Sequence, residues 1–188
     1  MPTREEVMRA LTGTLLIARQ DPRAEDCFDF SVEGFWKSFF AALVGLPFFL
    51  VLVLHELFVI GPEAPLAALA ARLVSYALDW PVFALAAALL VRLVGLGQRY
   101  VPLVVMVNWA TVPQLAVMAA TVMLVLLLPA SLAPFLLVVA LTTVLFYRWT
   151  VMRRALGGLG GTAFGFLVVD VLLGILTERL IAALFGVG

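Results

Sequence analysis

Three side chains that can bind protons or ions interrupt long apolar stretches of this sequence: Asp79, Asn108 and Asp170. An ionisable group at the centre of a membrane costs roughly 2.5–3.5 kcal/mol. At ~1.5 Å of helical rise per residue, all three fall at a similar depth in their stretches. Trp80 and Trp109 follow two of them, and each indole N–H needs an acceptor. The pattern predicts a mid-membrane polar cluster, either a protonatable site or hydrogen bonds that join helices.

A second group of polar and charged residues lies nearer the ends of the same stretches: His55, Glu56, Arg72, Glu178 and Arg179. A helix face with Arg72 opposite a helix face with Glu178 predicts that these two residues pair, and Glu56 with Arg179 is the next expected pair. We expect a structural ion network, with a substrate or ion path as the alternative.

Signatures of catalysis and of metal binding are poor in this sequence. His55 and Glu56 begin like the zinc motif H-E-x-x-H, but Val59 occupies the position of the second histidine. Cys27 is the single cysteine and His55 the single histidine, so clusters of thiolate or imidazole ligands are excluded. We expect no metal, no cofactor and no enzymatic activity. An intramembrane enzyme would need a pocket that opens to the bilayer beside Asp79 or Asp170.

The composition indicates a protein that is solvated by lipid. The chain has 188 residues, of which 64% are hydrophobic, and a mean hydropathy of +1.15. A soluble domain is roughly 45–50% apolar. The formal net charge is zero, so no overall field attracts nucleic acid, and the lipid bilayer is the expected partner.

Five apolar stretches predict an all-α fold: a polytopic membrane protein with five transmembrane helices preceded by an amphipathic interfacial helix. The stretch 101–147 has no charged residue and would be ~70 Å long as one helix, against a hydrocarbon core of ~30 Å. It must therefore turn back, and Pro129 to Pro134 is the expected turn. The transmembrane bundle is expected over 35–188, with spans at about 35–60, 65–94, 100–128, 133–149 and 162–185.

The basic residues between spans fall in alternate connections: Arg92, Arg99, Arg148, Arg153 and Arg154. The connections near 61–65 and 129–134 contain neither Lys nor Arg. This positive-inside pattern predicts a cytoplasmic N-terminus and a periplasmic C-terminus. Richness in Ala, Leu and Val, and Arg in preference to Lys, favour a bacterial inner (cytoplasmic) membrane.

The segment 1–34 is expected to be cytoplasmic and amphipathic. Thr3 and Glu6 have the spacing of a capping box at the start of a helix. Val7, Leu11 and Leu15 then recur at helical spacing and form an apolar stripe. Such a helix lies in the membrane interface or docks on a partner, and these three residues are the candidate contact surface.

The layout of five closely spaced spans after a cytoplasmic segment, with Arg99-Tyr100 and Asn108-Trp109 in the third span, resembles the Yip-domain (Ypt-interacting protein) superfamily and its bacterial relatives. The resemblance implies a non-enzymatic bundle that works through protein or lipid partners. The expected function is that of a scaffold, assembly factor or accessory subunit of a membrane complex, bound to another membrane protein or to itself. The alternative is a small oligomeric transporter or proton-coupled carrier that uses the mid-membrane carboxyl groups.

Overall fold

The computed structural model describes residues 1–187, apart from the side chain of Ile60, and within this range the chain forms helices and turns but no strand. The helices are α1 (Arg4–Ala18), α2 (Val32–Ser38), α3 (Ala41–Ile60), α4 (Pro65–Leu93), α5 (Tyr100–Val125), α6 (Ala133–Ala155) and α7 (Gly160–Phe185). The connecting 3-10 turns are η1 (Pro22–Cys27), η2 (Gly97–Arg99) and η3 (Ala130–Leu132). The expected all-α class is confirmed for these residues, and residue 188 of the expected bundle lies outside them.

Four stretches of the described residues are long and apolar enough to cross a membrane: Val32–Val59, Pro65–Leu93, Gly97–Val125 and Ala130–Ala155. Transmembrane helices are therefore supported. Helix α7 has 26 residues but carries Asp170, Glu178 and Arg179, and it is not among the four. The fifth span stays a prediction.

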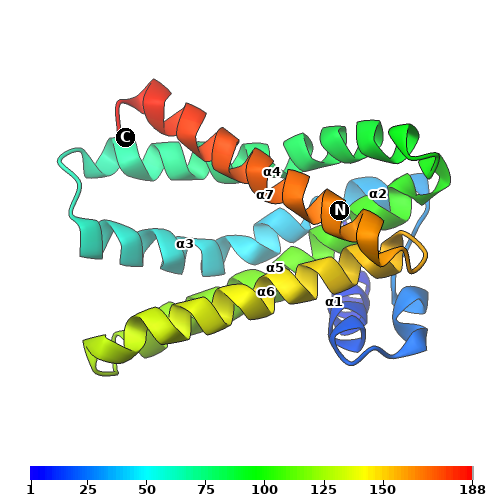
Figure 1. Ribbon diagram of the computed structural model, residues 1–188, viewed down its shortest axis with the longest axis horizontal. Coiled ribbons are helices and arrows are strands. Elements are labelled where there is room, and N and C mark those ends of the chain that lie inside the picture. The colour runs from blue at the N-terminus through cyan, green and yellow to red at the C-terminus, as the bar shows by residue number, and fades with distance from the viewer. Residues whose placement is uncertain (188) are drawn as a thin grey trace.

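The long helices run side by side along the long axis of the molecule, with α5 at the centre (Figure 1). Helix α5 packs against α3, α4 and α6, and α4 packs along α7. The α4–α5 and α6–α7 turns lie at one end of the bundle, whereas the α3–α4 and α5–α6 connections and the C-terminal end of α7 lie at the other (Figure 1). We call the first the basic end, because Arg92, Arg99, Arg153 and Arg154 belong to the helix ends and the turn found there.

The stretch expected as one helix over 35–60 is two helices in the structure. Helix α2 begins earlier than expected because the Ser31 side chain caps it, accepting a hydrogen bond of 3.0 Å from the Gly34 N–H. It ends at Ser38, whose hydroxyl donates to the Phe35 carbonyl at 2.7 Å. A serine that bonds back to its own helix favours a bend, and α3 starts three residues later, at Ala41.

Helix α6 continues to Ala155, beyond the expected end at Trp149. It stops where Gly157 and Gly158 adopt positive φ angles of 75° and 90°, a conformation that favours glycine. Arg148 lies within α6, as the expected span 133–149 has it, so counting it among the basic residues between spans was wrong. The other expected helix ends lie within a few residues of the observed ones.

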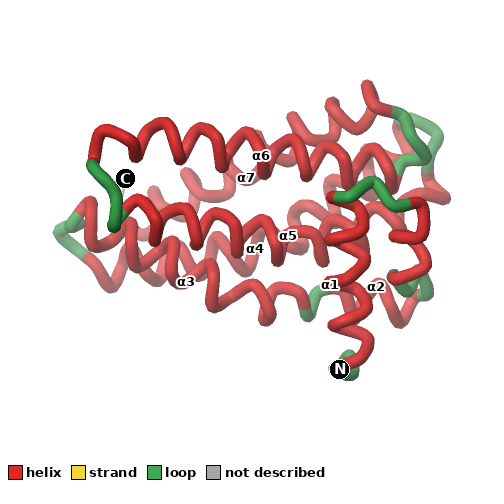
Figure 2. The backbone as a smooth tube through the Cα atoms, turned by 90° about the horizontal axis from the view of Figure 1, so that it is seen from below, coloured by secondary structure: helices red, strands yellow, loops and turns green. Residues whose placement is uncertain are grey.

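Helix α1 lies across the direction of the long helices, near the basic end (Figure 2). The capping box of Thr3 and Glu6 is confirmed, with hydrogen bonds of 3.2 and 2.6 Å. Val7 and Leu11 are partly buried against the protein's own core, whereas Leu15 is 57% exposed. The residues that α1 buries most completely are Ala10, Gly13, Thr14 and Ile17. The expected contact stripe is thus divided between an internal interface and the surface.

Glycine allows α1 to approach η1 closely. A Cβ on Gly13 would lie 2.7 Å from the Cβ of Cys27 and 2.8 Å from the Phe28 ring. A Cβ on Gly34 would lie 2.1 Å from the Asp29 carbonyl oxygen. Any larger residue at either position therefore displaces the backbone around it.

Polar contacts fasten the N-terminal segment to the bundle. Lys37 Nζ lies 2.7 Å from Glu6 Oε1, and the Tyr147 hydroxyl donates to the Thr14 carbonyl at 2.8 Å. At the end of α6, Arg154 Nε donates to Glu25 Oε1 at 3.2 Å. These contacts join residues far apart in the sequence, so the segment is part of the folded protein.

The Glu6 contact makes docking of α1 sensitive to acid. Its hydrogen bond from Lys37, helped by the Thr3 N–H, lowers the pKa of Glu6 from 4.5 to about 2. Because the folded pKa is the lower one, the contact is complete above pH 4.5 and is lost as the pH falls toward 2. A spin label at Thr12, in a chain with Cys27→Ser, should become mobile over that interval.

Glu6→Gln should make the same label mobile already at pH 7, whereas Glu5→Gln should leave its mobility unchanged. Equal label mobility in the Glu6→Gln and parent chains at pH 7 would show that this contact does not hold α1.

Candidate functional site

A buried ion pair joins α6 to α7. Arg148 Nε donates to Asp170 Oδ2, and Arg148 Nη2 donates to Asp170 Oδ1 at 2.9 Å. The side chains are 16% and 11% exposed. Arg148 Nη1 also donates to Thr111 Oγ1 and Gln114 Oε1 on α5, both at 3.2 Å. The paired donors of one arginine therefore fix three helices relative to one another.

This ion pair lines a cavity of about 270 Å³ between the helices. Helices α3 to α7 all contribute residues to its wall. The polar side chains of the wall are Tyr76, Asp79, Asn108, Thr111, Arg148 and Asp170. The structure therefore brings the three polar residues singled out in the sequence, Asp79, Asn108 and Asp170, to one cavity.

Asp79 differs from the other charged residues of the cavity because it has no hydrogen bond or ion pair within residues 1–187. Its side chain is exposed, and it belongs to α4, a helix able to cross a membrane. Two carboxyl groups thus face a single guanidinium, and Asp170 already occupies two of its donor atoms. A proton or a cation at Asp79 would neutralise the remaining charge.

Asn108 contributes a second polar contact at the cavity. Its Nδ2 donates to the Ser38 hydroxyl at 2.9 Å, and the exposed fractions of these residues are 2% and 0%. This bond joins α5 to the end of α2. The NH2 group of the Asn108 amide therefore links two helices.

The two tryptophans beside the cluster lie in different places. Trp80 is 7% exposed and lines the cavity. Trp109 is 4% exposed and faces the N-terminal segment, beside a hollow of about 20 Å³ that Glu6 and Lys37 also line. Trp109 therefore belongs to the docking site of α1 and not to the polar cavity.

The predicted ion network has Arg72 at its centre and lies near the end of the bundle opposite the basic end. Arg72 donates to Glu56 of α3, and its Nη1 lies 2.6 Å from Glu178 Oε1 of α7. Glu56 therefore pairs with Arg72 and not, as expected, with Arg179, because one guanidinium reaches both acids. Among the described residues neither Arg179 nor His55 forms an ion pair. Glu56, Arg72 and Glu178 line a separate cavity of about 480 Å³.

Arg148 is the functional candidate that the sequence analysis missed. It was counted with Arg153 and Arg154 as a basic residue of a connection. Two signals could have identified it: the glycines that end α6 lie roughly two and a half turns beyond it, and Asp170 needs a cation within the bundle.

Comparison of the chain with protein-family models, with curated proteins and with solved structures gives no significant match. The helices that are long and apolar enough to cross a membrane support a helical membrane protein, and its described residues line a polar cavity between the helices. Within the described residues, no three His, Cys, Asp or Glu side chains are grouped to hold a metal ion.

Removal of one partner of the buried pair should destabilise the bundle. Asp170→Asn removes the carboxylate that bonds the Arg148 guanidinium directly and leaves Asp79 as the remaining carboxyl group of the cavity, so the loss should be below the about 3–5 kcal/mol of a broken buried pair. The variant should therefore unfold at lower temperature or denaturant concentration in detergent than the parent protein.

The double variant Arg148→Gln with Asp170→Asn should be more stable than Asp170→Asn alone, because the guanidinium that lost its bonded partner is also removed. If the single and double variants lose equal stability, the pair does not govern the stability of the bundle. Circular dichroism during denaturation measures both.

Proposed function

We propose that this protein is a small membrane carrier that binds a proton or a small cation at Asp79. The observation that carries the proposal is the unpaired Asp79 carboxyl on the wall of a cavity that also holds the Arg148–Asp170 pair. A purely structural cluster would satisfy each of its charged groups, as Asp170 is satisfied here.

The cavity at Arg72 and the cavity at Asp79 lie along the same polar face of α4. A proton or a small cation could follow this face. Arg72, Ser75 and Asp79 follow one another at three- and four-residue spacing on α4. Arg72 and Ser75 line the outer cavity, and Asp79 lines the inner one. Helix α7 matches this arrangement, with Glu178 at the outer cavity and Gly174 at the inner one. We infer that solute reaches Asp79 from the end opposite the basic end.

The proposal places the protein in a bacterial inner membrane with five spans, its basic end and N-terminal segment in the cytoplasm and the Arg72 cavity toward the periplasm. The basic residues at one end support this orientation through the positive-inside rule. Helix α7 would be the fifth span, with Asp170 neutralised by Arg148 and Glu178 by Arg72. Five spans are few for a carrier, so we propose that it works as an oligomer.

Asp79→Asn tests the site directly. In the parent protein, the infrared titration should contain a carboxyl contribution from Asp79 beside those of the other carboxyl groups, and proteoliposomes should pass protons when a membrane potential is imposed. Asp79→Asn should abolish both signals, because an amide binds no proton over this range.

Glu63→Gln is the matched control, since it removes one exposed carboxylate from the α3–α4 connection and leaves the inner cavity unchanged. It should keep both signals. An infrared titration and a proton flux that are the same in Asp79→Asn as in the parent protein would refute the proposal.

A second proposal is the accessory-subunit function, which Leu15 favours. This residue is 57% exposed on α1 and lines an apolar pocket of about 310 Å³ between α1, α5 and α6. The resemblance to Yip-domain proteins agrees with a function through such partners.

Leu15→Ala should weaken a stable complex or homo-oligomer roughly fivefold if the exposed leucine anchors it. Native mass spectrometry after gentle extraction measures the assembly. Thr12→Ala, at another exposed position of α1, is the control and should leave the assembly intact. An unchanged assembly in Leu15→Ala would exclude this surface.

A further inference from the structure

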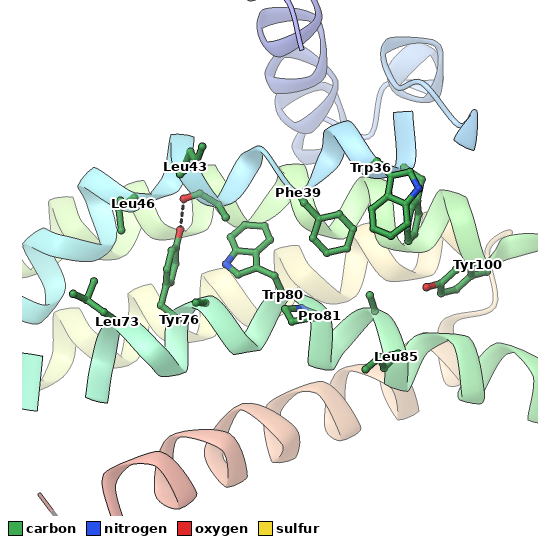
Figure 3. Close-up of a pocket in the computed structure, with 14 residues that line it drawn as sticks. Trp36, Phe39, Leu43, Leu46, Leu73, Tyr76, Trp80, Pro81, Leu85 and Tyr100 are labelled. Carbon is green, nitrogen blue, oxygen red and sulfur yellow. Dashed lines mark hydrogen bonds between the residues drawn. The ribbon is translucent and has the colours of Figure 1, made fainter. Parts of the chain in front are cut away.

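An apolar groove of about 830 Å³ lies between α4 and the α2–α3 pair. Figure 3 shows Trp36, Phe39, Leu43 and Leu46 on one side of the groove and Tyr76 and Trp80 on the other. Both sides belong to stretches that are long and apolar enough to cross a membrane, Val32–Val59 and Pro65–Leu93. The groove therefore faces the hydrocarbon region of a bilayer.

The bottom of the groove is sealed by contacts of Tyr76. Its hydroxyl donates to the Ala42 carbonyl at 2.7 Å, which fastens α4 to α3 (Figure 3). Its ring stacks on Phe49 with the two centroids 4.2 Å apart. Because Tyr76 and Trp80 also line the polar cavity, they separate the groove from it.

The groove contains the Tyr76 hydroxyl, already bonded to the Ala42 carbonyl, and the Trp80 indole N–H near its middle, and two further hydrogen-bond donors at one end. Trp36 and Tyr100 close the end nearest the basic end, and Trp36 is 68% exposed. Arg92 lies two turns beyond Leu85 on the same face of α4, toward the end where Tyr100 begins α5. Neither Arg92 nor these two residues has a side-chain hydrogen bond or ion pair among the described residues.

We propose that the groove is a binding site for an anionic phospholipid. One acyl chain lies between α3 and α4 against Leu46, Leu73 and Ala77, and the phosphate lies at Arg92. The Tyr100 hydroxyl and the Trp36 indole N–H donate to the ester and phosphate oxygens. This site is independent of the carrier function and of Asp79.

The distribution of polarity favours a lipid over other occupants. An acyl chain needs apolar walls for most of its length and a charged partner at one end, which is the order found from Leu73 to Arg92. A helix of another protein needs no cation at one end of its groove. Anionic headgroups are attracted to basic residues at the membrane surface, and aromatic residues with polar tips favour the same level.

Native mass spectrometry of the full chain, stripped of lipid and titrated with phosphatidylglycerol or phosphatidylcholine of equal chain length, tests the site. Phosphatidylglycerol should bind one molecule per chain with higher affinity than phosphatidylcholine. Arg92→Gln should lower the affinity for phosphatidylglycerol roughly fivefold and that for phosphatidylcholine less, because the choline cation already offsets the charge of its phosphate. Ala77→Phe, at an exposed position within the groove, should weaken the binding of both lipids.

Arg153→Gln is the matched control, because Arg153 lies at the same end of the bundle but over the Trp149 ring, 5.5 Å from its centroid. It should bind phosphatidylglycerol like the parent chain. Three results would each overturn the proposal: equal affinity for the two lipids, equal losses in Arg92→Gln and Arg153→Gln, or binding unaffected by Ala77→Phe. A stripped chain that forms a dimer blocked by Ala77→Phe would instead assign the groove to a second copy.

Discussion

The rest of the bundle depends on the ion pair between Arg148 and Asp170. Neither charge is tolerated alone among apolar helices, so the position of each determines that of the other. Helix α6 must continue as a helix through Arg148, and α7 must present Asp170 toward it. The same guanidinium bonds Thr111 and Gln114, so the central helix α5 is held in register with both. The polar cavity lies where these helices meet. The ion pair therefore determines which side chains line the cavity.

Helix α4 then separates two environments. The face with Arg72, Ser75 and Asp79 meets α7 and the two polar cavities, whereas the face with Leu73, Ala77 and Leu85 lines the apolar groove. Tyr76 and Trp80 lie between them and contribute to both. A single helix can serve the two sites because its faces repeat every 3.6 residues, so a polar and an apolar stripe run along its whole length. The proposed ion site and the proposed lipid site are therefore neighbours without sharing their decisive residues.

Helix α1 of the N-terminal segment uses much of its apolar stripe for contacts within the protein. The stripe is typical of a helix that lies in the membrane interface, and α1 crosses the direction of the long helices (Figure 2). However, Gly13 lets it pack tightly on η1, and Glu6 and Thr14 are bonded to residues of the bundle. Part of its apolar surface is buried against the bundle, and Met8 and Leu15, each 57% exposed, remain for contacts outside the protein.

The sequence by itself was enough to predict the all-α class, helices long enough to cross a membrane and the capping box at Thr3, whereas the fifth predicted span stays a prediction. These follow from local properties: apolar length, helical spacing and the side chains near a helix end. Only the tertiary structure decided that Arg148 pairs with Asp170, that Arg72 serves both Glu56 and Glu178, and that Trp109 faces α1. The reason is physical: each of these contacts joins different helices, and spacing along one helix cannot specify how far another is rotated about its axis or how far it extends.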